Sequence, residues 1–197
     1  GRPGPGVPVT HGEGDPCAIA TGSPAGGALV GDARLSLAAL NACLQDPQGT
    51  AAPGADPASP GRRLVARARA AKLAAFAPLA ASEERPIRPE RVMAALRRCL
   101  PADAIVCADP GTPCPYVSAY FDLPVAGRHF LTNRAHGALG FAMPAALGAW
   151  FARPAQRCVA VMGDGSFGFV AGELEAVLRH GAPLLLLVLS NASFGWI

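Results

Sequence analysis

The chain has 197 residues, of which 51% are hydrophobic and 16% charged, and its formal net charge is +3. This length suffices for one globular domain, or one and a half, with a buried core. The small net charge gives no indication of a nucleic-acid partner. The longest apolar run, Pro183–Leu189, has the length of a strand and is too short to cross a membrane.

The cysteines do not form a metal-binding or disulfide pattern. None of the six is spaced as Cys-x-x-Cys, and most lie in apolar or helical surroundings. We therefore expect neither a zinc site nor a disulfide framework, and we expect the protein to lie in a reducing compartment. The beginning of the chain lacks the charged and then apolar pattern of a signal peptide, so a cytoplasmic protein is expected.

Sequence patterns divide the first half of the chain into three parts. Residues 1–27 have no sustained hydrophobic period and are expected to be disordered or irregular. Within 28–46, a short apolar run precedes an amphipathic helix that opens near Asp32. Residues 47–85 combine a Pro- and Gly-rich linker with a helix, Arg62–Ala80. The basic face of this helix is either a patch for anions or, as we favour, a solvated surface; it consists of Arg62, Arg63, Arg67, Arg69 and Lys72.

From residue 86 onward, strands and helices alternate at the spacing of βαβ units. The predicted strands are 104–108, 129–132, 157–162 and 184–190, and the predicted helices are 89–100, 115–120, 139–151 and 170–180. Such alternation indicates an α/β fold with a doubly wound, mainly parallel sheet and helices on both faces. Strands that are apolar throughout, such as Leu184–Leu189, belong in a buried parallel sheet.

Two polar residues end neighbouring predicted strands. Asp164 follows one strand directly, and Asn191 follows the next strand along the chain. A right-handed crossover would bring both residues to the carboxyl edge of the sheet, where ligands bind in open parallel sheets. One carboxylate oxygen and one amide oxygen suit Mg²⁺, with phosphate oxygens and water completing its shell. The carbonyl of Ser193 is a candidate for a further ligand.

Glycines beside Asp164 favour a phosphate site. Gly163 and Gly165 are expected to let the backbone turn sharply and approach a ligand closely. The amides of Gly165 and Ser166 would lie ahead of the following helix, where free N–H groups favour a phosphate. Gly-Asp-Gly also occurs as an ordinary turn from strand to helix, so Asn191 is needed to make the functional interpretation strong.

Two segments together resemble a known family. GDGSFGFVAGELEAVLRHGAPLLLLVLSNASFGW resembles the thiamine-diphosphate-binding motif of the acetolactate synthase-like and benzoylformate decarboxylase-like enzymes. HGALGFAMPAALGAWFARP resembles the stretch that precedes this motif in the same family. The resemblance covers about residues 86–197, as a cofactor-binding domain truncated at its C-terminal end. Residues 28–46 more weakly resemble the end of the family's middle domain.

The resemblance implies a role for each matching position. Side chains of Asp164 and Asn191, with the carbonyl of Ser193, would hold Mg²⁺. The diphosphate of thiamine diphosphate would be held by two pairs of residues, Gly165 with Ser166 on one side and Gly111 with Thr112 on the other.

A second motif, Gly137-Ala138-Leu139, would contact the rest of the cofactor. Leu139 matches the bulky residue that supports the cofactor in its bent form, and the carbonyl of Gly137 would accept a hydrogen bond from the pyrimidine amino group. Leu139 is alternatively an ordinary core residue at a helix start. His136 adjoins this motif, as a substrate-facing or a structural histidine.

The chain also departs from the family. Ala192 stands where the family has a second Asn, which removes a hydrogen-bonding group but leaves the expected metal ligand. The family's catalytic Glu comes from an N-terminal domain of a neighbouring subunit, and no such domain is recognisable in this chain. We therefore expect no catalytic group here, an inactive fragment when alone, and a homodimer or tetramer for the full-length enzyme.

Three hypotheses about function follow. The first is the thiamine diphosphate and Mg²⁺ domain of an enzyme that decarboxylates a 2-oxo acid and passes the product carbanion to a proton or a second carbonyl. Whether FAD is also bound is left open. The second is a non-catalytic truncated remnant. The third is another nucleotide-binding α/β domain; it is weakened because there is no P-loop, and no Gly-x-Gly-x-x-Gly helix start has an acidic residue about 20 positions later.

Overall fold

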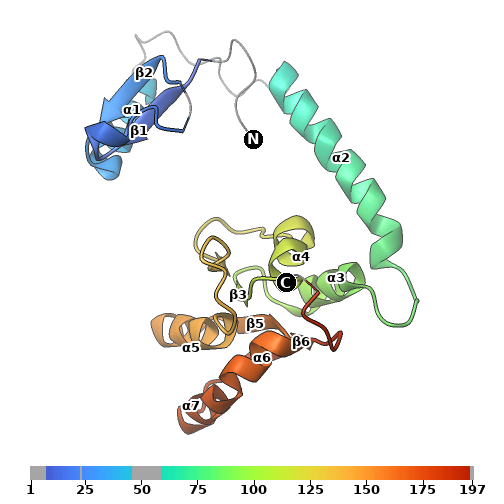
Figure 1. Cartoon of the computed structure of the whole chain (residues 1–197). Coiled ribbons are helices and arrows are strands. Elements are labelled where there is room, and N and C mark those ends of the chain that lie inside the picture. Colours follow the sequence, from blue (N-terminus) through green and yellow to red (C-terminus); the bar gives the residue numbers. More distant parts are fainter. Residues whose placement is uncertain (1–7, 23, 46–58, 196–197) are drawn as a thin grey trace. The chain divides into compact units, whose positions relative to one another are not determined.

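The computed structural model describes residues 8–22, 24–45 and 59–195. The chain divides into two compact units, Gly1–Val65 and Ala66–Ile197. Helix α2, Pro60–Ala80, runs through the division between them. Figure 1 gives the order of the elements along the chain. Each unit is described by itself below.

The first unit contains a small parallel sheet. Strand β1, Thr10–Glu13, pairs with β2, Gly27–Val30, and a 3-10 helix, η1 (Pro16–Ala18), lies between them. This corrects the expectation of a wholly irregular segment over residues 1–27. Both strands are largely exposed, so backbone pairing rather than an apolar face holds them, and the hydrophobic pattern carries no sign of it.

The predicted helix of this unit is present as α1, Ala33–Gln45. The carboxylate of Asp32 accepts a hydrogen bond from the Leu35 N–H at 3.0 Å, which is the capping contact expected of an Asp just before a helix. The greater part of the predicted linker, 46–58, lies outside the described residues.

The second unit is built on a four-stranded parallel sheet, and this confirms the predicted α/β fold. The strands stand in the order β4-β3-β5-β6, and every neighbouring pair is parallel. The bounds are β3 Ile105–Ala108, β4 Phe130–Leu131, β5 Cys158–Gly163 and β6 Leu185–Leu189. Strand β5 is buried along almost its whole length, as expected for a central strand covered on both faces.

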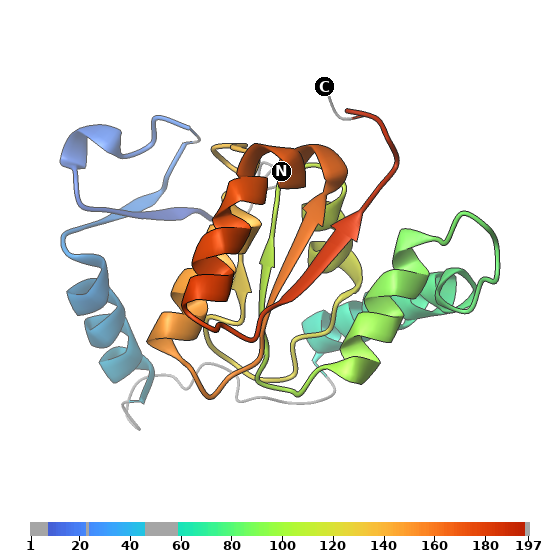
Figure 2. The same cartoon turned by 90° about the horizontal axis from the view of Figure 1, so that it is seen from below.

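Helices cover both faces of this sheet, as Figure 2 shows. They are α3 Pro89–Cys99, α4 Pro113–Tyr120, α5 Ala142–Ala152, α6 Asp164–Val170, η2 Ala171–Glu173 and α7 Leu174–Arg179. Residues of β3 and β5 alternate between two buried clusters because successive side chains of a strand point to opposite faces. One cluster contains Met143 of α5 and Val177 of α7, and the other contains Met93 of α3 and Val117 of α4.

Two helices begin at other residues than the sequence pattern predicts. Helix α5 begins at Ala142 rather than at residue 139, because Gly140 has a φ of +85°, outside the helical region. A helix also begins directly at Asp164, where we expect a turn and a helix only from residue 170. The glycines of this segment resemble helix breakers in the sequence, yet α6 accommodates them.

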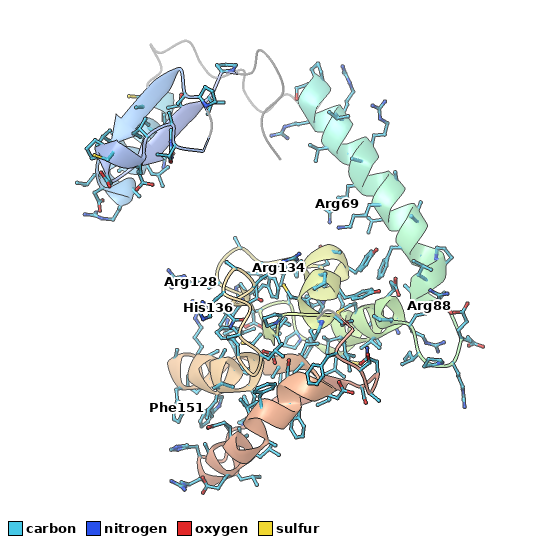
Figure 3. All side chains as sticks on the ribbon, viewed as in Figure 1. Arg69, Arg88, Arg128, Arg134, His136 and Phe151 are labelled. Carbon is cyan, nitrogen blue, oxygen red and sulfur yellow. The ribbon has the colours of Figure 1, made fainter. Side chains whose placement is uncertain are left out.

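The basic helix α2 has no buried residue. Arg69, labelled in Figure 3, lies 3.5 Å from Asp122, and both side chains are exposed. The Lys72 ammonium lies 5.7 Å from the ring centre of Tyr120, and Phe76 stacks on the same ring. Arg69 and Lys72 are therefore exposed, but they lie against Asp122 and Tyr120 of the second unit rather than in solvent alone. No helix among the described residues is long and apolar enough to cross a membrane.

Candidate functional site

A cavity of about 800 Å³ opens at the carboxyl edge of the sheet in the second unit. Its polar side is formed where β5 and β6 end, and its apolar side is formed by the start of α3 and the segment before it. Eight residues predicted for the site line it: Gly111, Thr112, Leu139, Asp164, Gly165, Ser166, Asn191 and Ser193. Gly137 and Ala138 do not line it.

Asp164 organises the loop that follows β6. Its Oδ2 accepts hydrogen bonds from the Ser190 hydroxyl at 3.0 Å, the Asn191 N–H at 3.2 Å and the Ala192 N–H at 2.7 Å. Its Oδ1 accepts one from the Gly165 N–H at 2.9 Å. These bonds, that from Ala192 foremost and that from Gly165 next, hold the pKa of Asp164 below its usual value. The group is therefore a carboxylate at neutral pH.

Asn191 lies beside this carboxylate. The pairing of Gly163 with Leu189 in β5 and β6 brings the two strand ends together, so the expected juxtaposition of Asp164 and Asn191 is present. The Asn191 Oδ1 accepts a hydrogen bond from the Ser193 N–H at 3.1 Å, which makes the loop a tight turn. Carboxylate and amide oxygens are the donor types that Mg²⁺ prefers, so this residue set fits a magnesium ion.

Ala192, the departure from the family pattern, has a left-handed backbone with a φ of +52°. Asn adopts this conformation several times more readily than most other residues. The second Asn of the family thus suits the backbone conformation of this position, whereas Ala192 holds it at a cost in strain.

Gly165 serves close packing rather than a sharp turn. Its φ is not positive, and Gly163 before it is extended, with φ −80° and ψ 164°. A Cβ atom on Gly165 would lie 2.4 Å from the Cε1 atom of Phe194, whose ring lines the same cavity. The glycine therefore makes room for this ring, which corrects the expected reason for its presence. Phe194 is a site residue that the sequence analysis does not single out.

The loop after β3 forms another part of the cavity wall. Gly111 has a φ of +87°, a left-handed conformation that favours glycine, and Thr112 directly precedes helix α4. Both residues line the cavity, as expected for a loop that approaches a ligand.

The loop between β4 and α5 carries Leu139 into the cavity wall. It turns at Gly137 and Gly140, whose φ angles are +76° and +85°. The Asn133 Nδ2 donates a hydrogen bond to the Ala138 carbonyl at 2.9 Å within the turn. His136 is exposed on this loop, as Figure 3 shows, and does not line the cavity.

Asp109 is a buried acid that the sequence analysis leaves without a role. Its side chain is fully buried at the end of β3, and its Oδ1 accepts hydrogen bonds from the N–H groups of Phe141 at 2.7 Å and Ala142 at 3.1 Å. Burial raises its pKa, against the opposing effect of backbone N–H groups of the α5 start. The sequence does offer a signal by which Asp109 could have been found. It is an acid at the end of an apolar strand, which is the same pattern that singles out Asp164.

The apolar side of the cavity is also absent from the predictions. It consists of Pro86, Ile87, Pro89, Val92 and Ala95, with Leu187 and Leu189 of β6. Helix α3 is distant from β6 in sequence, so only the tertiary structure places these residues together. Among the described residues, no cluster of three or more His, Cys, Asp or Glu could hold a metal ion, so a site here depends on amide and carbonyl oxygens beside Asp164.

Comparison with known proteins identifies the class to which this fold and site belong. Residues 109–197 match the family described as thiamine pyrophosphate enzyme, C-terminal TPP binding domain. The matched region contains the ends of β5 and β6 and the loop that Asp164 organises. Residues 109–197 therefore belong to the C-terminal cofactor-binding domain family of the thiamine pyrophosphate (thiamine diphosphate) enzymes.

The similar proteins are named as decarboxylases and as an acetolactate synthase subunit. The chain is 35% identical over 175 residues to the "probable 2-ketoarginine decarboxylase AruI" of Pseudomonas aeruginosa and 29% identical over 173 residues to the benzoylformate decarboxylase of that organism; each match covers 88% of this chain and 29% of the relative. It is 33% identical over 113 residues to the acetolactate synthase large subunit of Haemophilus influenzae, covering 56% of this chain and 19% of that subunit. The chain thus spans less than a third of these relatives.

Proposed function

We propose that the second unit binds thiamine diphosphate through Mg²⁺ in the cavity at the carboxyl edge of its sheet. The observation that carries this proposal is the convergence of Asp164 and Asn191, whose backbone N–H lies 3.2 Å from the Asp164 carboxylate. The Asp164 carboxylate, the Asn191 amide oxygen and the Ser193 carbonyl would hold the metal ion. These hard oxygen donors suit Mg²⁺, which also takes phosphate oxygens and water.

The neighbouring residues would hold the cofactor itself. Gly165 and Ser166 would lie against one side of the diphosphate, and Gly111 with Thr112 against the other, since all four residues line the cavity. Leu139 would support the cofactor in its bent form from the cavity wall. The contacts expected of Gly137 and Ala138 stay predictions from the resemblance, because neither residue lines the cavity.

We propose further that the enzyme containing this domain decarboxylates a small 2-oxo acid and acts as a lyase or a transferase. Thiamine diphosphate supplies the electron sink for this chemistry when bound. The residues of this chain bind and orient the cofactor, and the apolar wall around Val92 and Leu187 excludes water from it. The names of the three relatives are consistent with 2-oxo acid chemistry.

The catalytic Glu that the resemblance implies would come from a neighbouring subunit of a cytoplasmic homodimer or tetramer. We therefore expect this chain alone to bind the cofactor without turning over a 2-oxo acid. The measurement is release of carbon dioxide from pyruvate or benzoylformate by the purified chain with Mg²⁺ and thiamine diphosphate. Turnover by the chain alone would contradict the assignment of the Glu to another subunit.

Isothermal titration of the full chain with thiamine diphosphate and Mg²⁺ tests the binding proposal. We expect binding that disappears without Mg²⁺ and falls by at least about tenfold in Asp164→Ala, because a charged ligand interaction contributes about 1.5–3 kcal/mol. Glu175→Gln is the matched control: it changes an exposed carboxylate of α7 that does not line the cavity, and it should bind as wild type does.

The second candidate, a remnant that binds little cofactor, is favoured by Ala192 at a left-handed position. It predicts no heat of binding at millimolar thiamine diphosphate in wild type and in both variants alike. A further titration, with ATP or NAD, tests the hypothesis that the chain is a different nucleotide-binding domain. Binding of either nucleotide at the expense of thiamine diphosphate would overturn the proposed function.

A further inference from the structure

The segment that carries Leu139 enters helix α5 through a confined path. Gly140 follows Leu139 directly and is left-handed, and a Cβ atom there would lie 2.5 Å from the Cγ1 atom of Val170 in α6. The backbone at Gly140 therefore passes close against α6. Two residues later the helix begins, so the position of the α5 start fixes the position of Leu139.

Asp109 ties this helix start to the sheet. Its own backbone is held on two sides, because its N–H donates to the Val161 carbonyl at 3.0 Å and its carbonyl accepts from the Cys114 N–H at 3.1 Å. Its side-chain Oδ1 also accepts hydrogen bonds from the N–H groups of Phe141 at 2.7 Å and Ala142 at 3.1 Å. One residue thus joins β3, β5, α4 and α5.

This arrangement is costlier than an ordinary helix cap. A cap is usually a Ser, Thr, Asp or Asn at the residue before the helix, close to water. Here the residue before helix α5 is Phe141, whose side chain makes no capping hydrogen bond. The acceptor is instead Asp109, a fully buried acid directly after strand β3. The second carboxylate oxygen of Asp109, Oδ2, has no hydrogen-bond partner among the described residues. A buried carboxyl with a free oxygen lowers stability, so its presence calls for a role beyond capping.

We propose that Asp109 is a positioning residue that holds Leu139 in the cavity and so fixes the part of the cofactor that lies beyond its diphosphate. The inference rests on the proposed function. The proposal assigns different roles to two parts of the site. Asp164 and Asn191 would act on the diphosphate through the metal ion, and Asp109 would act through Leu139 on the pyrimidine and thiazolium rings of the cofactor. Loss of Asp109 should therefore weaken thiamine diphosphate selectively and leave inorganic pyrophosphate almost unaffected.

The test compares the dissociation constants of thiamine diphosphate and inorganic pyrophosphate, both with Mg²⁺, for the full chain. We expect Asp109→Ala to weaken thiamine diphosphate about tenfold, because the two hydrogen bonds that Asp109 accepts from the start of α5 are lost, and to weaken pyrophosphate by no more than about twofold. Asp109→Asn keeps one oxygen as acceptor for both N–H groups and should restore most of the affinity. The matched control is Asp103→Ala, which changes an exposed acid near the other end of β3 and should leave both constants unchanged.

Leu139→Ala completes the experiment. Alone it should reproduce the selective loss, and in combination with Asp109→Ala it should add little, because both changes act on the same contact. Where Asp109→Ala fails to fold, Leu139→Ala and Asp109→Asn decide the question. Equal weakening of both ligands, or additive losses in the double variant, would overturn the inference. A wild-type chain that binds pyrophosphate but not thiamine diphosphate, or neither, would instead overturn the proposed function on which it rests.

Discussion

Two acids at the ends of adjacent parallel strands have opposite electrostatic surroundings. Asp164 ends β5 and accepts four hydrogen bonds, which hold its pKa low. Asp109 ends β3, accepts both of its hydrogen bonds on one oxygen and is fully buried, which raises its pKa. The first acid is thus suited to hold a cation, and the second is suited to hold a backbone in place.

Asp109 makes stability depend on pH. Because burial raises its pKa, the folded chain keeps a proton there at pH values where the unfolded chain has lost it. Its contribution to stability is fully present below the ordinary carboxyl pKa of about 4 and is lost as the pH rises through the raised value. In Asp109→Asn this titration is absent. The difference in free energy of unfolding, wild type minus Asp109→Asn, should therefore fall with rising pH in urea titrations.

A difference between wild type and Asp109→Asn that stays constant or grows with pH would contradict the account of Asp109.

Gly165 gives a second prediction at the scale of one residue. Gly165→Ala should displace the Phe194 ring, whose Cε1 atom lies 2.4 Å from the position of the new Cβ atom, and with it the loop after β6 that carries Asn191 and Ser193. Because the displaced ring lines the cavity and its loop carries Asn191 and Ser193, we expect thiamine diphosphate to bind roughly tenfold more weakly in titration calorimetry, a loss of about 1.4 kcal/mol. The thermal midpoint should change little, because Phe194 is exposed and free to move.

Gly168→Ala is the matched control, since it lies on the same helix and a Cβ atom there meets no atom within 4 Å. It should bind the cofactor as wild type does. In the double variant Gly165→Ala/Phe194→Ala the clash is absent, and affinity should recover. Equal affinities of the Gly165→Ala and Gly168→Ala variants would show that the contact with Phe194 has no bearing on binding.

At the scale of elements, the sheet and its helices follow from the sequence because their signals are local. The apolar strands 157–162 and 184–190 are predicted within one or two residues of β5 and β6, and the parallel order follows from the alternation of strands and helices. The same reasoning brings Asp164 beside Asn191, since parallel strands end at one edge.

Features that depend on distant partners could not be predicted. Helix α5 begins at Ala142 because the carboxyl group of Asp109, just after β3, and the contact between Gly140 and Val170 set its first turn. The pairing of β1 with β2 could not be predicted either, because the two strands have no apolar pattern in the sequence. Likewise, Phe194 and the apolar wall of the cavity come together only in the folded chain.

Helix α5 gives a prediction at this scale. Met143 is fully buried against β3 and β5, so Met143→Ala should lower the free energy of unfolding by about 2–5 kcal/mol. Leu178→Ala on α7 is the control, because that side chain is 78% exposed and its loss should cost less than about 0.5 kcal/mol. Urea unfolding followed by circular dichroism measures both changes. Equal losses in the two variants would contradict the assignment of the core.

At the scale of the whole molecule, the chain corresponds to the cofactor-binding part of longer relatives. It spans 29% of the length of two of the decarboxylases that it matches. The cavity in the second unit offers oxygen ligands and an apolar wall, and nothing in its lining serves as the Glu of the family. Under the proposed function the work is divided: this domain would bind and orient the cofactor, and the proton transfer on the cofactor ring would belong to another domain.

A crystal structure of the full chain with thiamine diphosphate and Mg²⁺ tests the central claim most directly. We expect one metal ion at about 2.1 Å from oxygens of Asp164 and Asn191, with diphosphate oxygens in the same shell. Leu139 should contact the cofactor between its two rings. A metal ion held elsewhere, or a diphosphate bound away from Asp164, would contradict the account.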